Sequence, residues 1–439
     1  MNRALRFLTA GSVDDGKSTL IGRLLFDSQA ILADQIDTLE RKAAGATAGA
    51  ADGEPRFDLS LLTDGLEAER EQGITIDVAY RYFATLKRKF IIADAPGHEQ
   101  YTRNMVTAAA GSDAAVVLVD ITKLDLRSRP LALLAQTRRH ALLAKLLRVP
   151  SIVFAINKID AVADPGAAYA AVREALLEFA AQAQIEVAGI VPVSALRGDN
   201  VTRPLGQPWY EGPTLLGFLE ALPAAQERSI GDLLVPVQFV ARESDGGNAS
   251  GSDNTPGSGH QPRTLWGRIA HGSVAAGDAV QIFPSGETAS VVEVRRAGTV
   301  VDRVHAGQSA GIVLDRQLDV SRGDWIASPG SVQARQRFAA TLAWLDTEPA
   351  IVGRKYWVRH GNRWVQARIV EIESRLDIHS LEAIDAHALA VNEIGNVIVE
   401  TQQPLPVEAF ETNRVGGSLI VVDPASHRTS GALLVKAPA

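Results

Sequence analysis

The feature that most constrains the fold of this chain is a loop near its N-terminus. Residues 11–18 read Gly-Ser-Val-Asp-Asp-Gly-Lys-Ser, follow an apolar stretch over 5–10 and precede a helical pattern over 19–26. Between a strand and a helix, this spacing lets backbone N–H groups surround phosphates, while a lysine neutralises the β and γ oxygens and a hydroxyl ligates Mg²⁺. The loop therefore predicts a nucleoside triphosphate site, with Lys17 and Ser18 in these two roles.

A second segment, after the apolar stretch 90–93, adds groups that suit Mg²⁺ and a terminal phosphate. Asp94 follows that stretch directly, so its carboxylate is expected at a strand end, where it can hold Mg²⁺ through water. Gly97 comes three residues later and offers a pliable backbone N–H to the γ-phosphate. Both residues are candidates for the same site.

Two further segments favour guanine as the base. Asn157, Lys158 and Asp160 follow the apolar stretch 151–156. A carboxylate at Asp160 can accept hydrogen bonds from N1 and N2 of guanine, a donor pair that adenine lacks. The segment Ser194, Ala195 and Leu196 follows another apolar run, and its backbone N–H groups suit the O6 acceptor of guanine.

Each motif is weak evidence alone, because Gly-rich turns and Asn-Lys-x-Asp loops often have only structural roles. Their order along the chain is the order that a GTPase requires, and each motif ends an apolar run. Together they predict a GTP site.

Hydropathy patterns predict three domains, as the length of 439 residues also suggests. Residues 1–224 alternate apolar runs with helical patterns, which predicts an α/β P-loop GTP-binding domain whose sheet is mostly parallel, with helices on both faces. The rest predicts two small antiparallel β-barrels, 230–335 and 336–439. The expected strands are 235–240, 267–271, 279–283, 290–295 and 311–314 in the first barrel, and 339–345, 355–360, 366–374, 396–401 and 418–423 in the second.

Two stretches of low complexity stand out. Residues 243–261 are rich in Gly, Ser, Asn and Asp, which predicts a surface loop of the first barrel without assigned chemistry. Residues 43–53 are rich in Ala and Gly and lie where nucleotide-dependent loops usually occur. Five tryptophans in the barrel strands are expected as core or interface anchors.

Composition excludes several classes of protein. The chain has no Cys, so disulfides, zinc-thiolate sites and cysteine nucleophiles are excluded. Its histidines lack metal-ligand spacing. The net charge of -7 gives no global positive field, so we expect no nucleic acid partner. No apolar run has the length of a membrane span and no cleavable signal is evident, so a cytoplasmic location without membrane binding is expected.

Longer matches resemble a known family. Residues 69–76 resemble the first switch of translation-factor GTPases, and His98 after Pro96 and Gly97 resembles their second-switch histidine. Elongation factors typically carry His where Asp15 stands. A more specific similarity, to the GTPase (CysN-type) subunit of bacterial sulfate adenylyltransferase, covers nearly the whole chain and is carried by residues 11–25, 69–83, 90–105, 136–140 and 208–216.

The resemblance implies roles for single residues. Thr75 would join Ser18 as a ligand of Mg²⁺, with Asp94 acting through water, and His98 would orient or polarise the attacking water. The implied catalytic residues are Lys17, Thr75 and His98. The implied nucleotide contacts are Gly11, Asp14, Gly16, Lys17, Ser18, Thr19, Asp94, Gly97, Asn157, Lys158, Asp160, Ser194, Ala195 and Leu196.

The resemblance also implies an activity and a partner. A smaller catalytic subunit would make adenosine 5'-phosphosulfate and pyrophosphate from ATP and sulfate, while GTP hydrolysis by this chain would drive that step. A low basal rate, stimulated by a partner, is expected. No second phosphate loop occurs, so the adenylylsulfate kinase activity of some family members is not expected. The alternatives are a translation factor that delivers aminoacyl-tRNA and a nucleotide-binding scaffold without turnover.

Overall fold

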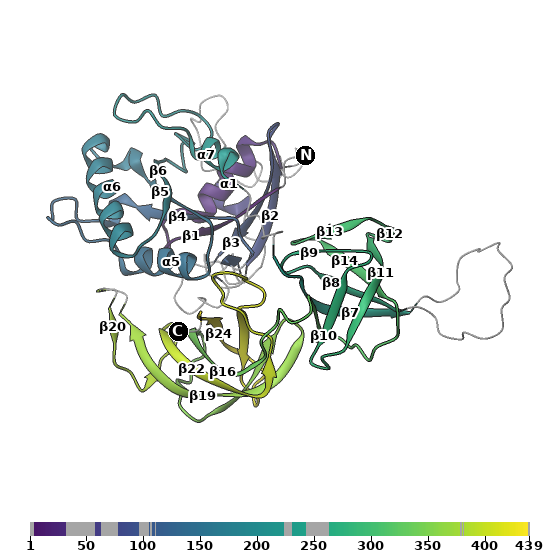
Figure 1. The fold of residues 1–439 in the computed structure, drawn as a ribbon. Coiled ribbons are helices and arrows are strands. Elements are labelled where there is room, and N and C mark those ends of the chain that lie inside the picture. Colours follow the sequence, from purple (N-terminus) through teal and green to yellow (C-terminus); the bar gives the residue numbers. More distant parts are fainter. Residues whose placement is uncertain are drawn as a thin grey trace. The chain divides into compact units, whose positions relative to one another are not determined.

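The computed structural model describes residues 4–31, 58–62, 78–95, 105, 108–109, 111–223, 231–242, 263–377, 380 and 382–437. The chain divides into two compact units (Figure 1). One comprises Met1–Ala225 with Asp377–Glu382, and the other comprises Gln226–Leu376 with Ala383–Ala439.

The N-terminal unit is built on a six-stranded sheet in the order β2-β3-β1-β4-β5-β6. All neighbours are parallel except β2, an edge strand that pairs antiparallel with β3. The sheet is thus mostly parallel, as predicted, although the strand β2 was not foreseen. The strands are β1 (Leu5–Ala10), β2 (Ala79–Ala84), β3 (Lys89–Asp94), β4 (Ala114–Asp120), β5 (Ser151–Asn157) and β6 (Val187–Pro192).

Helices cover both faces of this sheet. Its central strands β4 and β5 are therefore buried along their whole length. Leu20 and Leu24 of α1 and Leu215 of α7 pack into one core cluster with alternate residues of the strands. Helix α5 packs on β4 and β5 and α6 packs on β6, away from α1 and α7 (Figure 1). The helical elements are α1 (Lys17–Asp27), η1 (Leu59–Leu62), η3 (Ile121–Lys123), α5 (Ala135–Leu146), η4 (Ile159–Ala161), α6 (Pro165–Gln182) and α7 (Leu215–Ala221).

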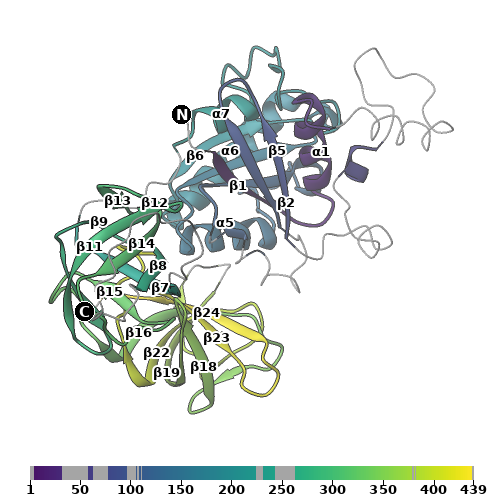
Figure 2. The ribbon, with the colours of Figure 1, turned by 90° about the vertical axis from the view of Figure 1, so that its right-hand side faces the viewer.

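The first barrel of the C-terminal unit closes through the strand order β10-β15-β7-β8-β14-β11, with β11 pairing back to β10. Its aliphatic core includes Val237, Val280 and Ile312. Figure 2 shows this barrel in teal to green. Its strands are β7 (Leu234–Arg242), β8 (Arg263–Arg268), β9 (Ser273–Ala275), β10 (Ala279–Phe283), β11 (Thr288–Arg296), β12 (Thr299–Val300), β13 (Arg303–His305), β14 (Ser309–Leu314) and β15 (Trp325–Ala327).

One predicted strand in this barrel, 267–271, is correct only at its first two residues, which belong to β8. The strand β8 ends at Arg268, and the next two residues lie in an irregular segment that is nevertheless buried. There the N–H of Ile269 donates to Gln308, and the N–H of Ala270 donates to Leu234. Burial of this apolar pair, without ladder pairing, produced the misleading strand signal.

The second barrel closes in the same way, through the order β18-β23-β24-β16-β22-β19 with β19 pairing back to β18. Each predicted strand of this barrel overlaps an observed one, whereas β24 and the two-residue strands β17, β20 and β21 were missed. Its core includes Leu342, Val358 and Val397. Its strands are β16 (Arg335–Trp344), β17 (Ala350–Ile351), β18 (Lys355–His360), β19 (Arg363–Leu376), β20 (Ala383–Ile384), β21 (Ala388–Leu389), β22 (Ile394–Leu405), β23 (Ser418–Val422) and β24 (Thr429–Val435).

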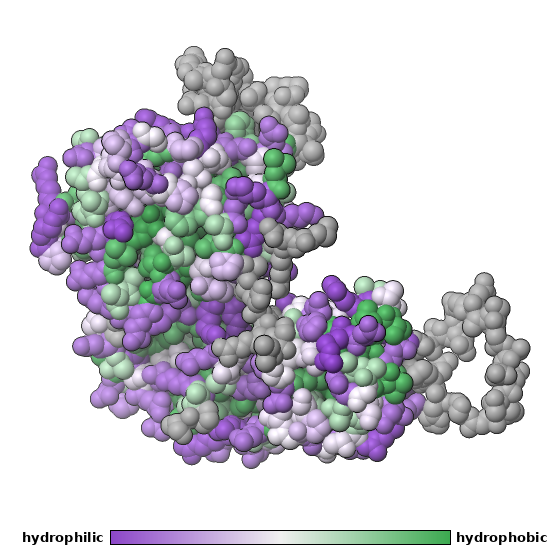
Figure 3. Space-filling view, turned by 45° about the horizontal axis from the view of Figure 1, so that its top comes forward, coloured by the Kyte–Doolittle hydropathy of each residue, from purple (hydrophilic) through white to green (hydrophobic). Residues whose placement is uncertain are grey.

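Hydrophilic residues surround smaller apolar areas on the face shown in Figure 3. Within the described part of the chain, the helices lack the length and apolar content that a membrane span requires. The predicted loops 43–53 and 243–261 lie outside the described residues.

Candidate nucleotide site

The phosphate loop connects β1 to α1 at the carboxyl end of the sheet. Gly16 caps α1 with φ of 90°, and a Cβ at this position would lie 2.3 Å from Nδ2 of Asn157. A side chain would therefore clash there, in addition to the strain of the left-handed conformation. The sequence requirement for glycine at this position thus has a direct steric cause.

Lys17 bridges the loop from inside. Its Nζ donates to the carbonyl of Gly11 at 2.9 Å and to that of Ser12 at 2.7 Å, and the residue is only 7% exposed. Burial lowers the pKa of Lys17, while the charges of Asp94 and Asp15 oppose this effect. An anionic phosphate at the loop would further favour the charged ammonium.

Asp15 is fully buried and organises the same loop. Its Oδ2 accepts a hydrogen bond from the N–H of Ser12 at 2.6 Å, and its Oδ1 lies 2.9 Å from Nζ of Lys123. Lys123 also donates to the carbonyl of Val13. The contribution of Lys123, which lies three residues beyond β4, was not predicted from the sequence.

Asp94 ends β3 directly beside the phosphate loop strand. Its backbone is in register with Thr9 of β1, whose hydroxyl lies 3.2 Å from the Asp94 carboxylate. Ser18 stands in the first turn of α1 and is partly exposed. The described candidates for Mg²⁺ ligation are thus the Asp94 carboxylate and the Ser18 hydroxyl, with no cluster of three or more His, Cys, Asp or Glu among the described residues.

Asn157 joins three of the predicted motifs. Its Nδ2 donates to the carbonyl of Asp15 at 2.8 Å, and its Oδ1 accepts from the N–H of Ala195 at 3.0 Å. The phosphate loop and the two segments predicted to contact guanine therefore meet at the carboxyl ends of β1, β5 and β6. Ligands of open α/β sheets bind at this edge.

The residue predicted to select guanine is partly exposed. The Asp160 side chain is 16% exposed, and its Oδ2 lies 3.4 Å from Nε of Arg197. Lys158 adopts a left-handed conformation with φ of 63°, and its Nζ lies 2.7 Å from Asp120. Burial opposes ionisation of Asp120, but hydrogen bonds from Lys158 and Thr122 outweigh it and lower the pKa of Asp120.

The segment Ser194, Ala195 and Leu196 forms a tight turn. The carbonyl of Ser194 accepts from the N–H of Gly198 at 2.7 Å, and its Oγ accepts from the N–H of Arg197 at 3.1 Å. Leu196 is 68% exposed at the tip of this turn. Two other residues are predicted to contact the phosphates. Asp14 has φ of 61°, and Thr19 lies in α1.

Three predicted site residues lie outside the described residues: Thr75, Gly97 and His98. Their roles stay predictions. Four residues that were not predicted from the sequence contact the candidate site residues, namely Thr9, Arg23, Asp120 and Lys123. Only Asp120 had a usable signal, because it ends an apolar strand in the same way as Asp94.

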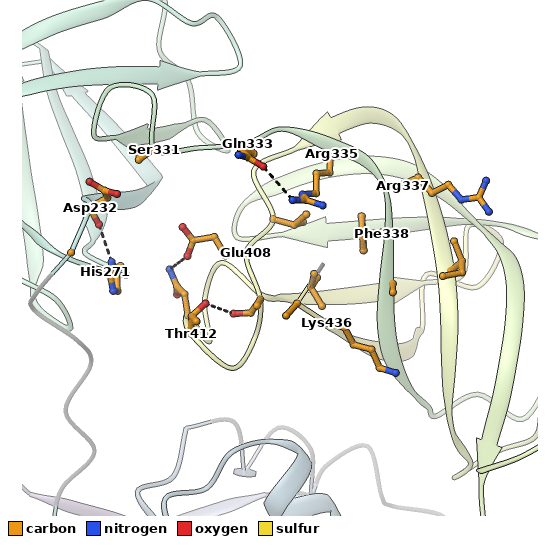
Figure 4. A pocket seen from close by; sticks show the side chains of 18 of the residues that line it. Asp232, His271, Ser331, Gln333, Arg335, Arg337, Phe338, Glu408, Thr412 and Lys436 are labelled. Atoms are coloured by element: carbon orange, nitrogen blue, oxygen red, sulfur yellow. Dashed lines mark hydrogen bonds between the residues drawn. The ribbon is translucent and has the colours of Figure 1, made fainter. Parts of the chain in front are cut away.

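A separate groove of about 930 Å³ lies between the two barrels of the C-terminal unit (Figure 4). Asp232 and His271 line it from the first barrel, and Arg335 and Glu408 line it from the second. Nδ1 of His271 lies 2.9 Å from the carbonyl of Asp232, and Asn413 donates to Glu408 at 2.7 Å. Its lining mixes both charges, and we assign it no ligand.

A phosphate loop, an Asn-Lys-x-Asp segment and a Ser-Ala turn on one mostly parallel sheet define a P-loop GTPase domain, and the two closed barrels that follow are the plan of translation-factor GTPases. Comparisons agree: residues 2–236 match the elongation factor Tu GTP binding domain, and residues 337–436 match the GTP-eEF1A C-terminal domain-like family.

Curated relatives narrow the assignment. Sulfate adenylyltransferase subunit 1 of Laribacter hongkongensis is 39% identical over 98% of this chain and 85% of its own. The same subunit of Citrobacter koseri is 41% identical over 99% and 86%. Bifunctional enzyme NodQ of Azospirillum brasilense is 43% identical over 99% of this chain, which spans 66% of that relative. The chain belongs to the sulfate adenylyltransferase subunit 1 family, which confirms the resemblance found in the sequence.

Proposed function

We propose that this chain binds GTP with Mg²⁺ and hydrolyses it as the GTPase subunit of sulfate adenylyltransferase. The observation that carries the proposal is the junction made by Asn157, which ties the phosphate loop to the base-recognition turn in a chain of this family. Relatives named for sulfate adenylyltransferase disfavour the alternative of aminoacyl-tRNA delivery.

The described residues would hold GTP at both ends. Lys17 and the loop N–H groups would contact the β and γ phosphates, and the N-terminus of α1 would add positive potential. Asp160 would accept from N1 and N2 of guanine. In the turn at Ser194, Ala195 and Leu196, the N–H of Leu196 would donate to O6, because the N–H groups of Ser194 and Ala195 donate to Asp199 and Asn157. Asn157 keeps these two ends of the site in a fixed relation.

The donor set fits Mg²⁺. This ion prefers a few protein oxygens completed by water and phosphate oxygens. Ser18 and, from the family resemblance, Thr75 would provide hydroxyls, and the buried carboxylate of Asp94 would act through water. When bound, the ion neutralises charge that develops on the phosphates.

Hydrolysis would depend on positioning, because phosphoryl transfer needs little covalent chemistry from the protein. His98 would orient or polarise the water, and Gly97 would contact the γ-phosphate. After hydrolysis, the segments that carry Thr75 and Gly97 would lose their contact with the γ-phosphate. This loss would change the surface offered to a partner. A slow basal rate is part of this proposal.

The partner would be a smaller catalytic subunit that makes adenosine 5'-phosphosulfate and pyrophosphate from ATP and sulfate. The relatives' designation as subunit 1 supports the existence of such a partner. Energy released by GTP hydrolysis would drive that unfavourable synthesis.

Nucleotide titration tests the first half of the proposal before any partner is needed. GDP and GTP should bind the purified chain in the presence of Mg²⁺, whereas ADP and ATP should bind far more weakly. Equal affinity for adenine and guanine nucleotides would contradict the assigned role of Asp160. Binding of charged tRNA in a parallel assay would instead support the translation-factor alternative.

A further inference from the structure

Arg23 is a buried charge inside the nucleotide-binding unit. It lies in α1, six residues after Lys17, and is 1% exposed. A guanidinium loses most of its hydration at such a site, which is costly unless its N–H groups find acceptors. The acceptors that Arg23 uses therefore indicate what the residue is for.

Two of these acceptors lie in the turn proposed to contact guanine. Nε of Arg23 donates to the carbonyl of Ala195 at 3.3 Å, and Nη2 donates to the carbonyl of Leu196. The third contact stays within α1, where Nη1 lies 3.5 Å from Asp27.

A second link reinforces the first. The hydroxyl of Thr202 donates to the other carboxylate oxygen of Asp27 at 2.5 Å. Between them, Gly198 has φ of +83°, and a Cβ at this position would lie 3.2 Å from Cδ of Arg23. The loop from Ala195 to Thr202 thus packs closely over the Arg23 side chain and is tied to α1 at two points.

These contacts hold the loop from Ala195 to Thr202 and also orient backbone N–H groups in its turn. A peptide unit is planar and trans, so its C=O and N–H point in opposite directions. By holding the carbonyl of Ala195, Arg23 fixes the direction of the N–H of Leu196 in the same peptide unit. On the other side of the turn, Asn157 accepts from the N–H of Ala195.

We propose that Arg23 is a positioning residue for guanine recognition, which holds the Ala195 and Leu196 carbonyls so that the N–H of Leu196 faces O6 of the base. Because α1 begins at Lys17, the same helix then links phosphate binding to base recognition. This inference rests on the proposed GTP site.

Affinities for GDP and for two analogues of GDP separate the contributions of single contacts to base recognition. Inosine diphosphate lacks the 2-amino group and reports on Asp160, whereas 6-thioguanosine diphosphate keeps N1–H and the 2-amino group but replaces O6 by a weaker acceptor. In the Arg23→Met variant, GDP affinity should fall about tenfold, and the preference for GDP over the 6-thio analogue should shrink about threefold. The preference for GDP over inosine diphosphate should stay unchanged.

Arg88→Met is the matched control. Arg88 is also a buried arginine of this unit, 8% exposed, and its Nη1 donates to the carbonyls of Leu219, Glu220 and Leu222, outside the base-recognition turn. Both variants should lower the melting temperature, but only Arg23→Met should change the discrimination at O6. Equal behaviour of the two variants, or an unchanged ratio in Arg23→Met, would overturn the inference.

Two milder variants keep the test decisive if Arg23→Met fails to fold. Arg23→Lys retains one cationic donor and should give an intermediate ratio. Thr202→Val removes the second link and should shift the same ratio in the same direction, by less, and no shift in either variant would overturn the inference. A wild-type chain that does not prefer guanine would instead refute the proposed function itself, independently of Arg23.

Discussion

The carboxylate of Asp15 and the ammonium of Lys123 lie 2.9 Å apart, and they join the phosphate loop to the end of β4. Asp15 is fully buried, whereas the Lys123 side chain is 33% exposed. The pair also holds the N–H of Ser12 and the carbonyl of Val13. Two of the loop's backbone groups therefore depend on it.

Lys123→Met should weaken GDP binding about tenfold, because Asp15 would remain buried without its cation, and partial exposure of Lys123 limits the loss. Titration calorimetry measures this change. Asp15→Asn added to Lys123→Met should recover part of the affinity. Lys145→Met is the control, since Lys145 donates to the carbonyl of Ala183, outside the phosphate loop. Additive effects of the two loop substitutions would show that the pair is not coupled.

Asp160→Asn should exchange the preferred base. An amide can donate to the 2-oxo group of xanthine, whereas it loses the paired acceptors that guanine N1 and N2 require. GTP affinity should fall by about two orders of magnitude, and XTP should bind better than GTP. Competition against labelled GDP gives both constants. Retention of guanine preference in this variant would remove Asp160 from base selection.

His98→Ala should leave GTP affinity largely intact and sharply lower hydrolysis, because a residue that orients water acts on the chemical step. Single-turnover hydrolysis, measured beside equilibrium binding, separates the two effects. A variant that hydrolyses GTP at the wild-type rate would exclude His98 from the mechanism.

His360 should make the C-terminal unit sensitive to acid. Its ring stacks on Trp325 with centroids 4.6 Å apart, and its Nε2 donates to the carbonyl of Gly416 at 2.9 Å. Burial lowers the pKa of His360 from 6.5 to about 4, although the bond to Gly416 opposes this shift. Between about pH 4 and pH 6.5, the ring is therefore neutral in the folded state and protonated in the unfolded chain.

The resulting stability is fully present above pH 6.5 and is lost as pH falls toward 4, by about 3 kcal/mol in all. His360→Gln should flatten this part of the pH profile of unfolding. His140 in α5, with a pKa lowered to about 3 by burial, gives the N-terminal unit a dependence of the same sign, which His360→Gln leaves in place. An identical wild-type and variant slope between pH 7 and 5 would refute the role of His360.

The parts of the fold that depend on short-range patterns were predictable. Strand β1, the glycines of the phosphate loop and the start of α1 follow from periodicity and spacing over a few residues. The doubly covered sheet and the succession of two barrels were confirmed for the same reason. The proposed roles of Thr75, Gly97 and His98 stay predictions.

Contacts between distant segments were not predictable. Arg23 and Ala195 are 172 residues apart, and Lys123 and Asp15 are 108 apart, so no local pattern marks these pairs. The wrong extension of the predicted strand 267–271 beyond Arg268 has a related cause, because Ile269 is buried by neighbours from elsewhere in the barrel rather than by a ladder. Periodicity reports burial, and burial alone does not distinguish a strand from a packed turn.

Coupling of GTP hydrolysis to sulfate activation can be measured as pyrophosphate released from ATP and sulfate, with and without the small catalytic subunit, while GTP hydrolysis is followed in the same samples. We expect that the complex forms adenosine 5'-phosphosulfate, that GTP raises its yield, and that GTP is consumed faster than by this chain alone. If neither the synthesis nor the hydrolysis responds to the small subunit, the proposed coupling is wrong.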